Sequence, residues 1–205
     1  MPSRQELRRA EILRTASSLF MAHGYAGVSM DDVLREVGGS KSTLYRYFSD
    51  KEDLFRSAVE LLLQERLREF DGFHMPDADV RECLVALGRH FARVVLAPQS
   101  IALHRLVTAE TTRVKGLGQT FYANGPAVGK TFLGGYLDMW NQEGRLRVED
   151  PIRAAAQLYE AMMGDLQMRL LVGASARISR READESIRSA VDVFLDGTAV
   201  QARAR

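Results

Sequence analysis

Apolar residues recur at every third or fourth position along almost the whole chain, which is the period of an amphipathic α-helix. The first stripe ends at His23-Gly24, and a glycine directly after the last periodic residue marks a helix end. No stretch alternates apolar and polar residues with a period of two between turn signals, so no β-sheet is expected. The pattern therefore predicts an all-α fold. The first stripe consists of Ile12, Leu13, Ala16, Leu19 and Phe20.

Two short helices are predicted between residues 29 and 48. Ser29 can cap the N-terminus of the first, and Asp31-Asp32 lie in its first turn, where the helix dipole favours acidic groups. Gly38-Gly39 ends this helix, and Ser40 opens the second. Each carries apolar residues at helical spacing: Val33, Leu34 and Val37 in the first, and Leu44, Tyr47 and Phe48 in the second.

Longer helices are predicted after residue 50. Ser49 and Glu52 have the spacing of a capping box, which starts a helix that runs to about Phe70. Asp150 can cap a later helix in which Pro151 is the first residue. The further helices are expected at roughly 78–97 (stopped by Pro98), 100–112, 126–143, 151–173 and 180–202, with a boundary at 71–76 and a broken connector around Gly116 and Gly118. This predicts a small helix-turn-helix head, residues 1–50, and a larger helical body, residues 51–205.

The two short helices and the glycine turn between them form the pattern of a helix-turn-helix, whose second helix enters the major groove of DNA. Ser40–Phe48 contains no acidic residue, but it has two cations and several hydroxyls. If Leu44 and Phe48 face the core, Lys41, Ser42, Thr43, Tyr45 and Arg46 lie largely on the open side. Such side chains suit phosphate oxygens and base edges. Ser29 at a helix N-terminus and Lys51 at the start of the next helix can each meet a phosphate. The alternative is a solvated surface with tyrosines that only cap a core.

The total charge is nearly balanced, with 28 Lys and Arg against 27 Asp and Glu, a net charge of +1. Residues 1–48 carry seven cations and five acids, hence +2, and no acid lies between Glu36 and Asp50. The balance excludes a bulk polycation but not a DNA-binding protein. It indicates that any DNA contact is small and salt-sensitive. Two copies of the head in a dimer would then matter more for affinity than the total charge of the chain.

Other function classes find little support in the sequence. Cys83 is the single cysteine, so no internal disulfide can form. Residues 124–131 resemble a phosphate-binding loop, but Asn124 stands where the pattern needs glycine and no predicted strand precedes it. The four histidines lack close ligand spacing and no catalytic set stands out, so we expect no metal, no cofactor and no enzyme. No apolar stretch has the length of a signal peptide or membrane span, which leads us to expect a cytoplasmic protein with no membrane partner.

One set of motifs resembles the TetR family of bacterial transcriptional repressors over residues 8–56. The motifs are Gly24-Tyr25, Ser29, Gly38-Gly39-Ser40-Lys41, Thr43-Leu44-Tyr45-Arg46-Tyr47-Phe48 and Lys51-Glu52-Asp53-Leu54-Phe55. The stretch Leu106–Val172, with Phe121-Tyr122 and Gly144-Arg-Leu-Arg, looks like the AefR-like branch. Gly39 departs from the family, which often has valine there, and this loosens the turn and leaves the angle of the second helix open.

The resemblance implies a homodimer that binds a palindromic, double-stranded DNA operator and is released by a small molecule bound in the body. The residues that it implies in DNA binding are Ser29, Lys41, Ser42, Thr43, Tyr45, Arg46, Tyr47 and Lys51. Large apolar residues of the body are core by default, and some can line an effector cavity; the candidates are Phe70, Phe91, His104, Phe121, Tyr122, Trp140 and Met163. Few charged residues accompany them, so we expect an apolar or aromatic effector of unknown identity.

The last two predicted helices carry apolar stripes that nothing later in the sequence covers. In the family these helices form a four-helix dimer bundle, and the corresponding candidates are Leu158, Met162, Leu166, Ile187, Val191 and Phe194. The alternative is that they cover the body's own core. Two other functions stay open from the sequence: a TetR-like regulator without a small-molecule effector, and a helical carrier or enzyme whose head is structural.

Overall fold

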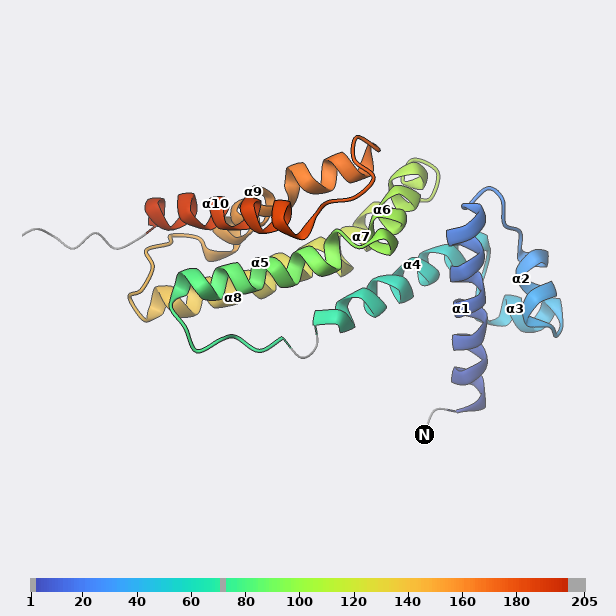
Figure 1. The fold of residues 1–205 in the computed structure, drawn as a ribbon. Helices are drawn as coiled ribbons and strands as arrows, with labels where there is room; N and C mark the ends of the chain where they lie inside the picture. Colours follow the sequence, from blue (N-terminus) through green and yellow to red (C-terminus); the bar gives the residue numbers. More distant parts are fainter. Residues whose placement is uncertain (1–2, 71–72, 199–205) are drawn as a thin grey trace, which may run out of the picture. The chain divides into compact units, whose positions relative to one another are not determined.

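A computed structural model describes residues 3–70 and 73–198 (Figure 1). Within these residues the chain forms helices and no β-strand, which confirms the all-α prediction. The helices are α1 (Arg4–His23), α2 (Met30–Val37), α3 (Lys41–Tyr47), α4 (Lys51–Leu67), the short 3₁₀ helix η1 (Arg68–Phe70), α5 (Val80–Val95), α6 (Pro98–Glu110), α7 (Leu117–Asn124), α8 (Pro126–Gln142), α9 (Pro151–Leu171) and α10 (Arg180–Thr198). None of the helices in the described part of the chain is long and apolar enough to cross a membrane.

Most predicted helix ends lie within a few residues of the observed ones, and the exceptions have local causes. Pro98 was expected to stop a helix, but α5 already ends at Val95 and Pro98 begins α6, where a missing N–H costs nothing. The expected connector around Gly116 and Gly118 contains α7, because Gly116 in the left-handed region makes the turn that starts it. The predicted end of the last helix at 202 lies outside the described residues.

The helix caps also correct one prediction. Asp50, not Ser49, is the N-cap of α4, since its carboxylate accepts from the Asp53 N–H at 2.8 Å. The Ser49 N–H instead donates to the Asp53 carboxylate at 2.9 Å. Asp150 caps α9 and Pro151 is in its first turn, as predicted.

Backbone packing divides the chain into two compact units. The first contains the chain up to Arg68 together with Ala102–Gly125, and the second contains Glu69–Ile101 and the chain from Pro126 onward. Helix α6 therefore gives its first residues to the second unit and the remainder to the first.

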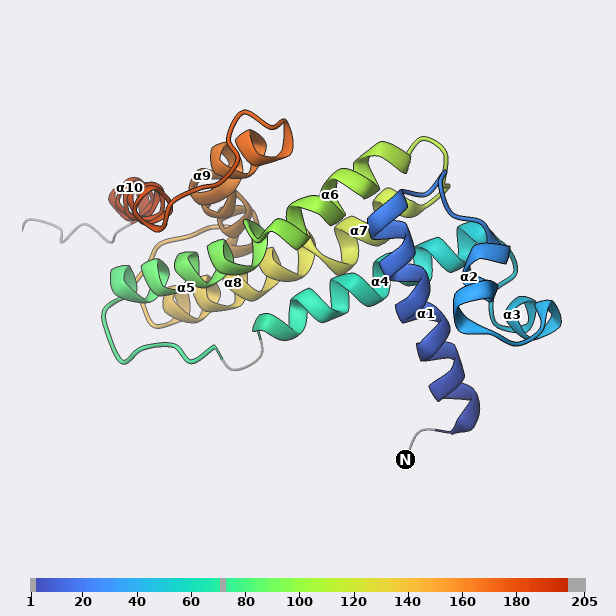
Figure 2. The ribbon, with the colours of Figure 1, turned by 45° about the vertical axis from the view of Figure 1, so that its right-hand side comes forward.

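In the first unit α1 packs across α4, and α2 and α3 lie together beside α1 in both views (Figures 1 and 2). Phe20 of α1 and Phe55 of α4 are buried and meet edge to face, with ring centroids 4.8 Å apart. Tyr25 lies 4.9 Å from Phe55 and closes this cluster. Aromatic pairs of this kind add to the area they bury, so they fix α1 against α4.

In the second unit α9 packs against α8 and α10, and α5 packs against α10. Gly88 allows α5 to approach α9 and α10 closely. A β-carbon at this position would lie 2.6 Å from a methyl carbon of Ile187 and 2.8 Å from the sulfur of Met162. Both neighbours are fully buried, so neither can move aside without disturbing the core.

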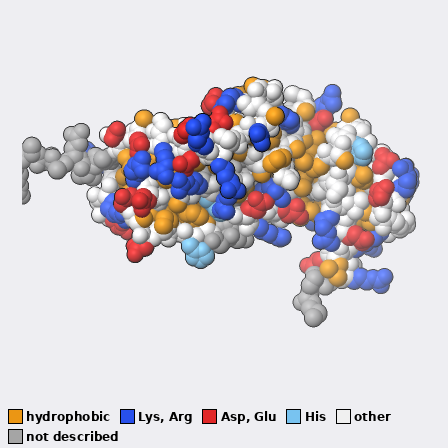
Figure 3. All heavy atoms as spheres, in the orientation of Figure 1, with side chains coloured by type: hydrophobic (Ala, Val, Ile, Leu, Met, Phe, Trp, Pro, Cys, Tyr) orange, Lys and Arg blue, Asp and Glu red, His pale blue; other side chains and the backbone are white. Residues whose placement is uncertain are grey.

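Ion pairs cover the outer surface of α5 and α10. Figure 3 shows basic and acidic side chains next to one another there. Arg89 and Arg188 both reach Asp184, at 2.6 and 2.8 Å, and these hydrogen bonds lower the pKa of that carboxyl to about 2. Exposed pairs of this kind contribute little individually, so the apolar interface and not the ion pairs carries the stability of the unit.

We predict that Gly88→Ala lowers the free energy of unfolding by about 1–3 kcal/mol, because the added carbon overpacks the α5–α9–α10 core. The measurement is urea unfolding followed by circular dichroism. Gly135→Ala is the matched control in α8, where a β-carbon meets nothing within 4 Å. It should raise the free energy of unfolding by about 0.5–1 kcal/mol, because alanine loses less backbone entropy in a helix. Equal effects of the two variants would contradict the packing described.

Candidate nucleic-acid interface

Helix α2 begins at a closed capping box. The Asp32 N–H donates to the Ser29 hydroxyl at 3.1 Å, and the Ser29 N–H donates to the Asp32 carboxylate at 2.8 Å. Hydrogen bonds from Ser29, first from its side chain and then from its backbone, lower the pKa of Asp32. The cap places Ser29 on the surface at the start of α2.

Helix α3 presents its polar side outward. Ser40 caps it through the Thr43 N–H at 3.2 Å, and Leu44 and Phe48 are 3% and 1% exposed in the core of the first unit. The orientation expected from the sequence is therefore confirmed. The side chains of Lys41, Ser42, Tyr45 and Arg46 are exposed, while Thr43 and Tyr47 are half-buried.

An ion pair joins the two short helices. Lys41 at the start of α3 lies 2.8 Å from a carboxylate oxygen of Asp31 in α2. This hydrogen bond and the negative charge of Asp31 raise the pKa of Lys41. Both side chains are exposed, so a phosphate that approached this surface would compete with Asp31 for the ammonium group.

Several predicted residues line one open hollow with a volume of about 440 Å³. Its wall is formed by the residues before α2, the first turn of α2, the outer side of α3 and the start of α4. Four of the eight DNA-binding candidates line it, namely Ser29, Lys41, Tyr45 and Lys51. The hollow thus brings together hydroxyls and cations from three separate segments, and the carboxylates of Asp31 and Asp32 also line it. Hydroxyls and cations are the groups that proteins use on nucleic-acid backbones.

Aromatic rings contact two of the candidate cations, Lys51 and Arg46. The Lys51 ammonium lies 4.1 Å from the Tyr25 ring centroid, and burial lowers the pKa of this lysine. Burial, followed by the charge of nearby acids, raises the pKa of Tyr25. The Arg46 guanidinium lies 5.1 Å from the Tyr47 ring centroid. Cation–π contacts restrict these side chains while their charged ends stay near the surface.

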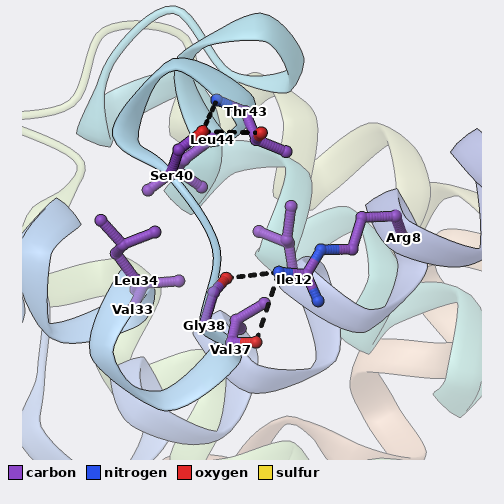
Figure 4. Close-up of a pocket in the computed structure, with 9 residues that line it drawn as sticks. All are labelled: Arg8, Ile12, Val33, Leu34, Val37, Gly38, Ser40, Thr43 and Leu44. Carbon is purple, nitrogen blue, oxygen red and sulfur yellow. Dashed lines mark hydrogen bonds between the residues drawn. The ribbon is translucent and has the colours of Figure 1, made fainter.

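Two arginines of α1 have a role that the sequence did not indicate. Arg8 donates to the backbone carbonyls of Val37 and Gly38, where α2 ends (Figure 4). The Arg9 guanidinium lies 5.3 Å from the Phe48 ring centroid, where α3 ends. Only the folded arrangement reveals these contacts, because exposed arginines on a helix have the same appearance in a sequence.

The effector candidates fall into two groups. His104 and Phe121 pack in the first unit, with ring centroids 5.1 Å apart, and burial lowers the pKa of His104; Tyr122 is exposed in the same unit. Phe91, Trp140 and Met163 are fully buried in the core of the second unit. The side chain of Phe70 lies outside the described part of the structure.

The dimer candidates lie mainly in the interior of the second unit. Leu158, Met162, Leu166, Ile187 and Val191 are buried, and Phe194 packs against the same core while it is half-buried. These apolar stripes thus cover the chain's own core, which was the alternative left open by the sequence. Other side chains of α9 and α10 form the surface that these helices present.

The remaining sequence features have structural explanations. Cys83 is buried, and burial raises the pKa of its thiol. The segment that resembles a phosphate-binding loop contains the first turns of α8. In the described residues, no three His, Cys, Asp or Glu side chains are grouped so that they could hold a metal ion.

Family comparisons agree with this geometry. Residues 12–58 match the family described as bacterial regulatory proteins, tetR family. Residues 82–197, more than half of the chain, match the C-terminal domain of AefR-like transcriptional repressors.

Two curated relatives are similar over short segments. The uncharacterised HTH-type transcriptional regulator YfiR of Bacillus subtilis (strain 168) is 40% identical over 67 residues, which is 33% of each chain. The HTH-type transcriptional repressor AcnR of Corynebacterium diphtheriae is 43% identical over 49 residues, 24% of this chain and 26% of that protein. The matches therefore span a third or less of the length of these relatives.

Two solved structures share the fold over nearly the whole chain. A protein described as a TetR-family transcriptional regulator from Mesorhizobium loti MAFF303099 superposes with a TM-score of 0.81 at 24% identity, covering 97% of this chain and 100% of that one. The flavonoid-responsive regulator FrrA superposes with a TM-score of 0.83 at 26% identity, covering 95% and 98%.

We predict that Asp31→Asn tightens binding to a random-sequence DNA duplex about two- to fivefold in low salt, because exposed ion pairs are worth up to about 1 kcal/mol and this one competes for Lys41. Fluorescence anisotropy with a labelled duplex measures the change, which should shrink as salt rises. Glu36→Gln, an exposed acid on the same helix, is the charge-matched control and should have a smaller effect. Weaker binding by Asp31→Asn would show that Asp31 itself contacts DNA favourably, against this interpretation.

Proposed function

Because the chain belongs to the TetR family of bacterial regulatory proteins, in its AefR-like branch, we propose that it is a homodimeric repressor. It binds a palindromic operator through α2 and α3, and a small apolar or aromatic effector releases it. The matching families are described as bacterial regulatory proteins and transcriptional repressors, so we propose a regulatory and not an enzymatic role. Residues 1–50 serve DNA binding in this proposal, and residues 51–205 serve effector binding and dimerisation.

The acid-free outer side of α3 is the observation that carries the DNA-binding role. Its exposed groups are two cations, a hydroxyl and a phenol, namely Lys41, Arg46, Ser42 and Tyr45. An α-helix fits into the major groove, where arginine and hydroxyl side chains read base edges. Lys41, Ser29 and Lys51 line the hollow beside this helix. We assign them to phosphate oxygens, which would fix the register of α3 without reading sequence.

Exposed apolar side chains on α9, α10 and the turn after α9 support the homodimer. Met168, Val172 and Val193 are 57%, 68% and 72% exposed, and Ile152 is 50% exposed. A second copy of the chain that covers these side chains would remove apolar surface from water, which favours association. We therefore place the dimer contact on these residues, and the buried stripes behind them support the helices from inside.

The effector class rests on composition and on one relative. The effector candidates are mostly aromatic or apolar, and His104 is the one titratable group besides tyrosine. Its lowered pKa favours a neutral imidazole that can accept or donate one hydrogen bond. The structurally similar FrrA is described as flavonoid-responsive, which is consistent with a planar aromatic ligand.

The DNA-binding role predicts a defined salt dependence. Replacing Lys41 and Lys51 by alanine should weaken duplex binding, and the slope of log K against log salt should fall by about 0.9 for each phosphate that the variant no longer neutralises. Tyr47→Phe added to this pair tests the phenol while it keeps the half-buried ring. Anisotropy titrations at several salt concentrations measure both quantities.

Lys115→Ala is the matched control, because Lys115 is an exposed lysine in the loop between α6 and α7. It should leave affinity and slope close to those of the wild-type protein. If the variants at 41, 47 and 51 bind as the wild type does at fixed salt, DNA does not contact this surface and the proposed function fails.

The effector proposal predicts that neutral planar aromatic compounds stabilise the protein. A ligand at 100 times its Kd raises the free energy of unfolding by about 2.7 kcal/mol, or roughly 5–10 °C in melting temperature for a chain of this size. A thermal-shift screen of flavonoids and other neutral aromatic compounds checks this, and nucleotides serve as the charged comparison. Stabilisation by nucleotides but not by aromatic compounds would contradict the assigned effector class.

A further inference from the structure

The turn between α2 and α3 contains two glycines in the left-handed region, and it does not fix its own geometry. Gly38 has φ of 72° and Gly39 has φ of 102°. Glycine adopts many backbone conformations at similar cost, so a Gly-Gly turn by itself lets α3 change its angle to α2. Something outside the turn has to hold α3 if its side chains are to meet particular bases.

Arg8 of α1 supplies such a contact. Its Nη2 donates to the Val37 carbonyl at 3.3 Å and to the Gly38 carbonyl (Figure 4). Its Nη1 is paired with Glu11 at 2.7 Å. The carbonyls at the end of a helix lack partners within it and carry the negative end of the helix dipole, so a guanidinium is well suited to them. Glu11 holds the guanidinium from its other side.

The space around this contact is nearly filled. The void lined by Arg8, Ile12 and Gly38, with residues of α2 and α3, has a volume of about 10 Å³, room for one water at most. A β-carbon on Gly39 would lie 3.0 Å from Arg8 Nη2. This distance is shorter than an ordinary van der Waals contact, so a side chain at residue 39 would press on the Arg8 guanidinium.

A second arginine holds the other end of α3. The Arg9 guanidinium lies 5.3 Å from the ring centroid of Phe48, the C-cap residue of α3. Consecutive residues of α1 thus contact the turn before α3 and the residue that ends it. Neither contact uses the outer, polar side of α3.

We propose that Arg8 is a positioning residue for DNA recognition: it fixes the Gly38-Gly39 turn and thereby sets the angle at which α3 meets base edges, without itself contacting DNA. This rests on the proposed function, since it assigns the origin of sequence specificity within the same interface. Binding to phosphates tolerates small shifts of α3, whereas hydrogen bonds to base edges do not.

The proposal predicts a split between two affinities of the full-length protein. One probe is a duplex that the wild-type protein selects from a random pool, and the other is a random-sequence duplex of equal length. Arg8→Met should lower the ratio of selected to random affinity about tenfold, which is the scale of one hydrogen-bonded base pair read by a side chain. The random-duplex affinity should stay within about twofold, with an unchanged salt slope, because that binding is electrostatic.

Two variants serve as rescue and control. Arg8→Lys keeps a cationic donor for the Gly38 carbonyl and should lower the ratio by less than about threefold. Arg14→Met removes the same charge from an exposed position of α1, where the arginine side chain makes no hydrogen bond or ion pair within the described residues, and should keep the wild-type ratio. If both affinities fall in Arg8→Met and the slope is lower by about 0.9, Arg8 contacts a phosphate and the proposal is overturned.

Amide hydrogen exchange without DNA separates this inference from the proposed function. Amides of Gly38–Thr43 should exchange faster in Arg8→Met, while those of α5 and α9 stay unchanged. Unchanged exchange in that segment overturns the inference. A wild-type protein that selects no duplex overturns the proposed function, and the exchange result still decides whether Arg8 holds the turn.

The dependence between positions 8 and 39 provides a further test through Gly39→Ala. Its backbone strain is present whichever residue stands at position 8, so strain cancels in a double-mutant cycle. If Arg8 and Gly39 act on the same turn, the double variant of Arg8→Met and Gly39→Ala lowers the selected-to-random ratio by less than the product of the two single effects. Multiplicative effects contradict the coupling, and this comparison also applies in the Arg8→Lys background should Arg8→Met fail to fold.

Discussion

Helices α2 and α3 are eight and seven residues long, and helices of this length are not stable alone in water. Their stability comes from burial against α1 and α4, through Val33, Leu44 and Phe48. The aromatic cluster of Phe20, Tyr25 and Phe55 keeps α1 and α4 together and so determines where the short helices can pack. The groups of the proposed DNA interface therefore take their positions from this apolar contact.

The charges of this chain suit selective binding of an anion better than general attraction of negatively charged molecules. The chain is nearly neutral, and Lys41 is paired with Asp31 while Lys51 lies over the Tyr25 ring. Partly engaged cations bind weakly to arbitrary anions but can exchange their partners for a phosphate held at the right place. In the proposed function the geometry of α3 decides which bases are read, and Arg8 contributes to that geometry through its hydrogen bonds to the end of α2.

The sequence predicted features that depend on local chemistry. The caps at Ser29 and Asp150, the helix end at Gly24 and the outward polar side of α3 each follow from a few neighbouring residues. Features that depend on distant partners were not predicted. Ser49 and Asp50 both fit a cap by spacing, and Asp50 is the one that caps α4. From the sequence, the apolar stripes that contain Leu158 and Ile187 could face either a partner or the chain's own core. In the structure both residues lie in one buried cluster with residues of α5. The contacts of Arg8 and Arg9 could not be predicted, because they depend on where α1, α2 and α3 lie relative to one another.

Hydrogen exchange of the full-length protein with and without a selected DNA duplex tests most directly whether the short helices form the binding surface. The expected result is slower exchange in peptides covering residues 29–51, with α5, α8, α9 and α10 unchanged. Protection confined to α5 through α10, or none within residues 29–51 when the duplex is saturating, would contradict the assignment of α2 and α3 as the DNA-binding element.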